Sequence, residues 1–361
     1  MDFSGHISTR QMAAVLFLSR IISLFTFMLP SASYIPPGDR VITAFAVMLI
    51  EFIYAAILIT TLKLNNGRSI IEASGEYSHI LSGIIAVLYI FAFLWAAGIG
   101  TARFELFIST VMFPNSELTL MIVILIAACV IASLKGIEAI GRASAVLLFV
   151  MGLSIAFILF SVAKEFEYYN LRPVAAEGIG PVTGFAFYVS TRAAELLSLN
   201  VSAPLIKGNV KKMIFLWIPV FSAVCTLILI FLTGVTGEYG DDQIFPLYTL
   251  TVIARFGIFE RLDDILTGLW VLCIFIQVAY LMYLSILCMN QGFGRVKKFP
   301  CALICASGIF AVYLYSSQTV TKFSDIVSNR ITDVIFIALM IVIPVAVTLI
   351  KKIKLKTRTK I

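Results

Sequence analysis

The chain has 361 residues, of which 60% are hydrophobic and only 13% charged, and its formal net charge is +7. A soluble globular domain carries about a quarter charged residues, so this composition excludes a water-soluble particle. The excess Lys and Arg residues stand beside apolar runs rather than in one patch, and we expect no nucleic acid partner.

Apolar runs of membrane-spanning length follow one another along the whole chain. About 20 helical residues, at ~1.5 Å each, cross the ~30 Å hydrocarbon core of a bilayer. The runs lack the alternation of membrane β-strands. We therefore predict an all-α integral membrane protein of about ten transmembrane helices, at about 8–33, 40–62, 81–111, 117–134, 143–163, 178–206, 213–236, 262–290, 299–317 and 331–350.

The basic residues predict the orientation of these helices. The expected inner segments hold 17 Lys and Arg residues and the expected outer loops hold seven. Since cytoplasmic loops carry the excess of Lys and Arg, we expect both termini in the cytoplasm. Residues 351–361 form a basic tail that fixes orientation and can also lie against anionic lipid head groups. Between spans, 64–80 predicts an inner surface helix and 237–261 an outer cap.

Two charged residues fall near the middle of the first two spans. Arg20 lies about twelve residues into the first span, and Glu51 about eleven residues from the outer end of the second. An unpaired charge at this depth costs at least ~2.5–3.5 kcal/mol, and a bidentate contact would satisfy both groups. A structural Arg20–Glu51 pair is one interpretation, and a direct role in ligand or proton binding is the other.

The sixth span carries a second pair of charges, Arg192 and Glu195, which share one face if the helix is continuous. Glycines precede them, and the segment Gly184-Phe185-Ala186-Phe187-Tyr188 predicts a break in the helix. Transporters bind substrates at the backbone groups of such breaks, although glycines also serve close helix packing. Our hypothesis is that Arg192 anchors a ligand carboxylate unless Glu195 neutralises it.

The other polar residues indicate less. Arg103 and Glu105 stand close enough to the outer interface to snorkel. The six cysteines all fall inside apolar runs, where we interpret them as core residues. We find no catalytic constellation and predict no enzyme, no cofactor and no metal site.

Several segments resemble the B subunits of spore germinant receptors, a branch of the amino acid–polyamine–organocation transporter superfamily. The resemblance extends over nearly the whole chain, and its order and spacing are more specific than any one motif. It rests on Ile7-Ser8-Thr9-Arg10-Gln11, Phe113-Pro114, Gly136-Ile137-Glu138-Ala139-Ile140-Gly141-Arg142, Phe245-Pro246-Leu247, Phe256-Gly257-Ile258-Phe259-Glu260-Arg261-Leu262-Asp263 and Trp270.

This resemblance implies an inverted five-plus-five repeat of the amino acid transporter (LeuT-like) type, with broken helices 1 and 6. The chain would be a single polytopic membrane domain, 1–361, with its first repeat at about 8–163 and its second at about 178–350. The family works in the inner membrane of bacterial endospores, with an A-type membrane subunit and a C-type lipoprotein subunit. A nutrient, usually an amino acid, would bind at the midplane and trigger germination.

The first span departs from the family pattern, which has glycine near the break of its first helix. Here the matching stretch is Ile22-Ser23-Leu24-Phe25-Thr26, ahead of Pro30. The sixth span has Arg192 where the family tends to have small residues. The residues expected to bind a ligand are Ser23, Leu24, Phe25, Thr26, Tyr89, Phe93, Gly184, Phe185, Phe187, Tyr188, Thr191, Arg192 and Trp270.

Three functions remain open from the sequence. The leading one is a nutrient-sensing receptor subunit that signals to partner subunits. The second is an ion-coupled secondary amino acid transporter, in which Glu51 or Glu195 would carry the proton. The third is a scaffold subunit without a working binding site. The absence of glycines near the expected break of the first span favours this function.

Overall fold

The computed structural model describes residues 5–25, 37–113, 117–172, 174, 178–254, 263–294 and 296–358, without the side chains of residues 23–25, 37, 238, 241, 242, 265 and 353–358. Nearly all of these residues are helical. In a bilayer each backbone N–H and C=O must find a partner within the protein, and an α-helix satisfies these groups within one segment. Long apolar runs without alternation therefore fold as helices here.

The first half of the chain forms five long helical segments. These are α1 (Thr9–Phe25), α2 (Pro37–Leu64), α4 (His79–Phe107), α5 (Thr119–Lys135) and α6 (Ile137–Ser161). A π-helical segment, η1 (Ile108–Met112), extends α4, and a short helix, α3 (Ile70–Gly75), follows α2. Ser69 and Glu72 form a capping box at the start of α3. A short helix thus lies within the predicted segment 64–80, and its placement on the inner membrane surface stays a prediction.

The second half begins with a divided span, α7 (Ile179–Thr191) and α8 (Ala194–Ser202). The helices α9 (Val210–Thr236), α11 (Asp263–Phe293) and α12 (Lys298–Ser316) follow, with α10 (Pro246–Ile253) between the first two of these. The last segment consists of α13 (Val320–Ser328), α14 (Arg330–Ile337), the π-helical η6 (Ala338–Val342) and α15 (Ile343–Arg358). Short 3-10 turns, η2 (Ala163–Glu165), η3 (Tyr168–Leu171), η4 (Ala203–Leu205) and η5 (Gly237–Asp242), connect several helices.

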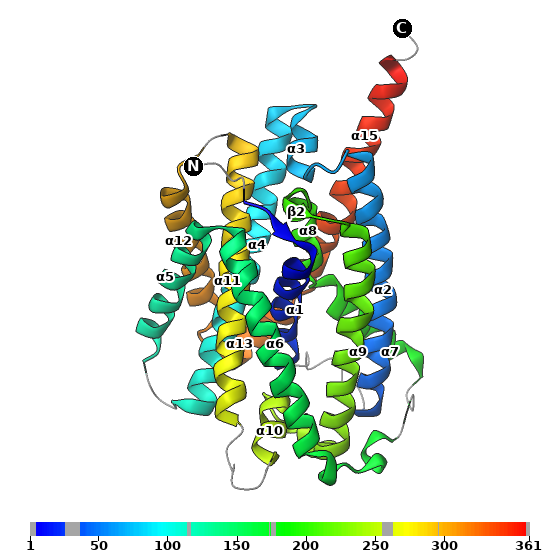
Figure 1. The fold of residues 1–361 in the computed structure, drawn as a ribbon, viewed down its shortest axis with the longest axis vertical. Coiled ribbons are helices and arrows are strands. Elements are labelled where there is room, and N and C mark those ends of the chain that lie inside the picture. The colour runs from blue at the N-terminus through cyan, green and yellow to red at the C-terminus, as the bar shows by residue number, and fades with distance from the viewer. Residues whose placement is uncertain are drawn as a thin grey trace.

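The helices form one bundle in which α1 and α8 lie inside (Figure 1). Helix α4 packs along α11, α2 packs against α7 and α9, and α1 contacts α6, α9 and α11. A two-stranded parallel pairing, β1 (Ile7–Ser8) with β2 (Ile206–Lys207), ties the chain before α1 to the chain after α8. The start of the first span is therefore fixed to the end of the sixth.

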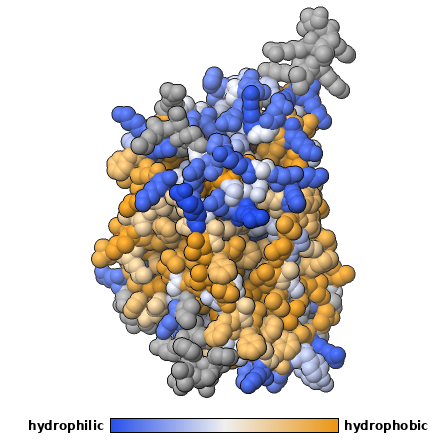
Figure 2. All heavy atoms as spheres, in the orientation of Figure 1, coloured by the Kyte–Doolittle hydropathy of each residue, from blue (hydrophilic) through white to orange (hydrophobic). Residues whose placement is uncertain are grey.

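The surface of the bundle matches a membrane environment. Figure 2 shows a broad hydrophobic belt, with hydrophilic side chains gathered at the end that carries α3 and β1. Within the described residues, seven helices are long and apolar enough to cross a membrane, and α5 is a shorter apolar helix. The prediction of an all-α, multipass integral membrane protein is confirmed.

Two details of the predicted spans need correction. The break in the sixth span was expected within Gly184–Tyr188, but α7 continues through that segment to Thr191 and the helix is interrupted at Arg192 and Ala193. Arg192 and Glu195 therefore do not share a continuous helical face. In the first span α1 is continuous to Phe25, and the remainder of that span, with Thr26 and Pro30, lies outside the described residues.

Candidate functional site

The interruption between α7 and α8 leaves backbone groups available in the middle of the bundle. Arg192 has φ −95° and ψ 16°, and Ala193 has φ −73° and ψ 72°, so the chain leaves the α-helical region there. The Ala193 N–H donates to the Ser190 carbonyl. In a continuous helix it would donate to Val189 instead, so the Val189 carbonyl can take another donor.

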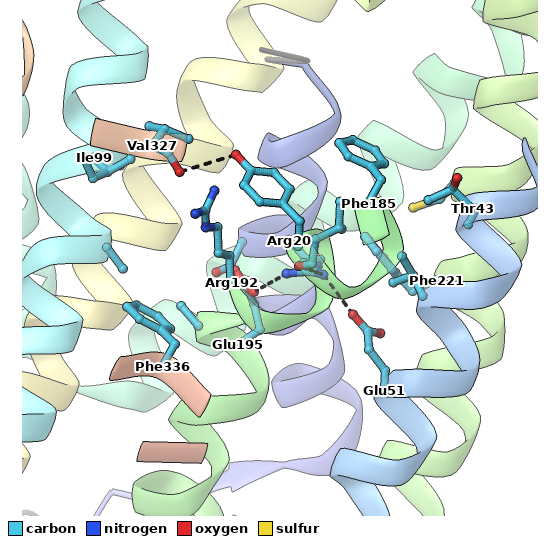
Figure 3. Close-up of a pocket in the computed structure, with 18 of the residues that line it drawn as sticks. Arg20, Thr43, Glu51, Ile99, Phe185, Arg192, Glu195, Phe221, Val327 and Phe336 are labelled. Atoms are coloured by element: carbon cyan, nitrogen blue, oxygen red, sulfur yellow. Dashed lines mark hydrogen bonds and ion pairs between the residues drawn. The ribbon is translucent and has the colours of Figure 1, made fainter. Parts of the chain in front are cut away.

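That donor is Arg20 of α1. Its Nη2 donates to the Val189 carbonyl at 3.1 Å and to Glu51 Oε1 of α2 at 2.8 Å, and its Nη1 lies 3.6 Å from Glu195 Oε2 of α8. All three charged side chains are at most 5% exposed. One guanidinium thus connects three elements and the helix break (Figure 3). The Arg20–Glu51 contact is the pair that the sequence predicts.

A second charged cluster lies on the other side of the break. Arg192 Nε forms an ion pair with Asp333 Oδ1 of α14 at 2.8 Å, and the Thr191 hydroxyl donates to the same oxygen at 3.0 Å. The Arg192 guanidinium lies 3.8 Å from the centre of the Tyr188 ring, a cation–π contact. Arg192 is thus held by Asp333 rather than by Glu195.

Both clusters border one cavity of about 200 Å³ (Figure 3). Residues of the α7–α8 segment, α1, α2, α4, α9, α11, α13 and α14 line it. Besides Arg20, Glu51, Arg192 and Glu195, the lining side chains are mainly apolar and include Val47, Met48, Trp95, Ile99, Phe185, Phe221, Ile326 and Phe336. The polar remainder consists of Ser19, Arg40, Thr43, Arg103, Tyr188, Ser222, Gln277 and Thr332.

The predicted ligand-binding residues divide into two groups. Phe185, Tyr188 and Arg192 line the cavity, and Thr191 is held against Asp333 beside it. Tyr89 and Phe93 are fully buried and do not line it, and the Tyr89 hydroxyl donates to the Leu339 carbonyl in η6 at 2.6 Å.

The remaining predicted residues lie away from the cavity or cannot be placed. Trp270 is fully buried and packs against Phe104 and Phe107. Gly184 and Phe187 are exposed on the outer side of α7. The side chains of Ser23, Leu24 and Phe25 and the whole of Thr26 lie outside the described residues.

Sequence reasoning missed several polar residues at the cavity, among them Arg40, Arg103, Gln277 and the neighbouring Asp333. Arg40 counts among the basic residues of the predicted outer loops, and Arg103 is predicted to lie near the outer interface. Asp333 stands only three residues into the last predicted span, and an acidic residue inside a span is the signal that could have identified it. In the described part of the chain, no group of three or more His, Cys, Asp or Glu side chains could hold a metal ion.

Solved structures of one transporter share this fold. The chain matches a manganese transporter from Eremococcus coleocola, in a crystal structure of a single-residue mutant, with a TM-score of 0.54 and 14% identity over 96% of this chain and 76% of the transporter. The same transporter bound to an aromatic bis-isothiourea compound gives a TM-score of 0.51 and 12% identity over the same shares. These likenesses confirm the predicted LeuT-like transporter fold.

Sequence comparison points to one family. A protein of Bacillus subtilis strain 168 that is provisionally named spore germination protein YfkT is 25% identical over 310 residues, which are 81% of each chain. The family described as "Spore germination protein" matches residues 6–323. This match covers most of the chain, from β1 into the first turn of α13, and includes every element that borders the cavity except α14 and the rest of α13. The chain belongs to the spore germination protein family of membrane permeases.

Proposed function

We propose that this protein is the nutrient-sensing membrane subunit of a spore germination receptor, and that it binds an amino acid in the cavity beside the α7–α8 break. The observation that carries the proposal is that this cavity is bordered by charges of both signs and is otherwise mainly apolar. An amino acid presents an ammonium group, a carboxylate and a side chain to its site.

The negative side of the cavity suits the ammonium group. Glu51 and Glu195 both face the single guanidinium of Arg20, so two carboxylates share one positive charge. When both carboxylates are ionised, this group of three has a net charge of −1. An incoming ammonium ion, or a proton, would balance it.

Family membership supports the sensing role and its setting. We infer that the protein lies in the spore inner membrane with both termini in the cytoplasm, and that it works with an A-type membrane subunit and a C-type lipoprotein. Ligand binding would shift the arrangement of α1 and α7–α8, which Arg20 holds together, and the partners would respond to that shift. The two halves of the chain, at about 8–163 and 178–350, would act as the two repeats.

Thermal unfolding of the purified protein tests the proposal, with amino acids, nucleosides and sugars as candidate ligands. A ligand at ~100 times its dissociation constant stabilises the fold by about 2.7 kcal/mol. We expect at least one amino acid to raise the unfolding midpoint, and Glu195→Gln to weaken that effect. Glu165→Gln, at an exposed position in η2, is the matched control. No stabilisation by any amino acid would contradict amino acid binding by the isolated subunit.

A second candidate is an ion-coupled secondary transporter, which the buried Arg20 group with its two carboxylates favours. Uptake of the stabilising amino acid into liposomes separates the two functions. Accumulation driven by a proton or sodium gradient would favour the transporter, and binding without accumulation would favour the sensor. Absence of both would leave the scaffold subunit as the remaining function.

A further inference from the structure

We infer that Arg103 of α4, rather than Arg192, receives the carboxylate of the bound amino acid. This inference rests on the proposed function and adds to it the residue that holds the carboxylate. Arg103 lines the same cavity and is half-buried at its edge.

Helix geometry directs Arg103 into the cavity. Trp95, Ile99 and Arg103 are spaced four residues apart on α4, so they lie along one face of the helix. All three line the cavity, and Ala96 joins them. The long Arg103 side chain therefore extends from the apolar part of the lining into the cavity.

Arg103 also differs from the other cationic groups because its guanidinium has no partner. Arg20 is engaged by Glu51, Glu195 and the Val189 carbonyl, and Arg192 by Asp333 and the Tyr188 ring. Arg40 has interactions of its own. Among the described residues, Arg103 has no hydrogen bond and no ion pair.

A half-buried guanidinium without a partner favours an anionic ligand, and a carboxylate matches its planar N–H donors. Arginine stays protonated under all ordinary conditions, so it cannot lose its charge when it is desolvated. Its charged neighbours are Arg192 and Arg20, of the same sign, and Glu195. A ligand carboxylate would accept two parallel N–H donors from Arg103 and screen it from the like charges.

The rest of the cavity can receive the other parts of an amino acid. With its carboxylate on Arg103, the ligand would direct its ammonium group toward Glu51 and Glu195. The apolar side chains of the lining would then surround the ligand's own side chain.

The test compares L-alanine, L-valine and L-leucine with their α-amides, which keep the ammonium group and the side chain but lack the carboxylate. Dissociation constants come from thermal unfolding and from calorimetry. For the wild type we expect at least one of the three amino acids to bind at least about tenfold more tightly than its amide, as for a charge-assisted hydrogen bond.

Three variants assign the effect to one residue. We expect Arg103→Gln to bind the acid and its amide equally weakly, and Arg103→Lys to restore part of the preference for the acid. Arg192→Gln should keep that preference. Because the acid and its amide are compared within each protein, a general loss of stability does not imitate the result.

The outcomes separate this inference from the proposed function. Unchanged discrimination between acid and amide in Arg103→Gln would overturn the role of Arg103 while leaving amino acid binding in place. If only Arg192→Gln loses the preference for the amino acid over its amide, Arg192 rather than Arg103 binds the carboxylate. If another amino acid stabilises the wild type and none of these three does, that amino acid and its α-amide take their place in the comparison. Failure of every amino acid contradicts both the role of Arg103 and the proposed function.

Discussion

At the residue scale, the structure depends most on Arg20, because two buried carboxylates face it. Replacing Arg20 with Met keeps the length of the apolar stem but leaves Glu51 and Glu195 without a cation. Removing one partner of a buried ion pair costs about 3–5 kcal/mol. We therefore expect Arg20→Met to lower the thermal unfolding midpoint strongly, as measured by differential scanning fluorimetry in detergent.

The origin of that loss can be checked with two further variants. Arg142→Met, at an exposed position in α6, removes an arginine with no buried partner and should leave the midpoint nearly unchanged. The double variant Arg20→Met/Glu51→Gln should recover part of the loss, because one unpaired carboxylate is then removed. Equal midpoints for Arg20→Met and Arg142→Met would contradict a stabilising role for the buried contacts.

The same scale shows what the sequence could predict of the site. Depth along a span identified Arg20 and Glu51, because both lie far from either end of a long apolar run. Position along the span did not predict that Arg103 lines the cavity. A residue near the outer end of a span can extend to the membrane surface or can face a cavity. Only the packing of α4 against its neighbours distinguishes these cases, and periodicity within one helix does not contain that information.

At the scale of elements, the contact between α4 and α12 depends on a glycine. A Cβ at Gly98 would lie 2.5 Å from Val312 of α12 and 3.2 Å from the Ile309 carbonyl. Gly98→Val should therefore push the helices apart and cost about 1–3 kcal/mol by overpacking. Gly152→Val in α6 is the matched control, because a Cβ there meets nothing within 4 Å.

We expect Gly98→Val to unfold at a lower temperature than Gly152→Val in the same detergent. Both substitutions add the same β-branched side chain to a helix, so intrinsic propensity is matched and packing alone differs. A smaller loss in Gly98→Val than in Gly152→Val would mean that α4 and α12 separate at no cost, which would contradict the close contact described here.

The helix break illustrates why element boundaries were harder to predict than the elements themselves. Glycine density placed the break at Gly184–Tyr188, yet Gly184 is exposed and α7 passes through it undisturbed. The interruption occurs at Arg192 and Ala193, where no glycine stands. There Arg20 donates a hydrogen bond to the Val189 carbonyl, and Asp333 forms an ion pair with Arg192. Partners from other helices stabilise this break, and a local sequence pattern cannot reveal them.

At the scale of the whole molecule, the successful predictions used features that many residues share, such as the length of an apolar run. These run lengths placed the spans close to the helices that the structure describes, because one polar residue within a run changes its length little. The short α13 was missed, since it lies in a loop too short for a spanning run. Its residues Phe323, Ile326 and Val327 nevertheless border the cavity.

The orientation of the molecule in the membrane is a further prediction at this scale. The end that carries α3 and β2 is rich in hydrophilic side chains (Figures 1 and 2), and the basic residues of the sequence place this end in the cytoplasm. Lys211 follows β2 at the start of α9, and Glu165 stands in η2 after α6; both are exposed. The six native cysteines are buried, so a new surface cysteine is the reactive one.

We expect Glu165→Cys to react with a membrane-impermeant maleimide on intact spheroplasts of a bacterial host, because its position follows the fifth predicted span, which crosses from the inner to the outer side. Lys211→Cys should react only after the membrane is permeabilised. The unsubstituted protein, treated in both ways, measures the background from the buried thiols. Labelling of Lys211→Cys on intact spheroplasts, with protection of Glu165→Cys, would reverse the orientation. The cavity edge at Arg103 would then face the cytoplasm, and a sensor of external nutrients could no longer receive its ligand from that side.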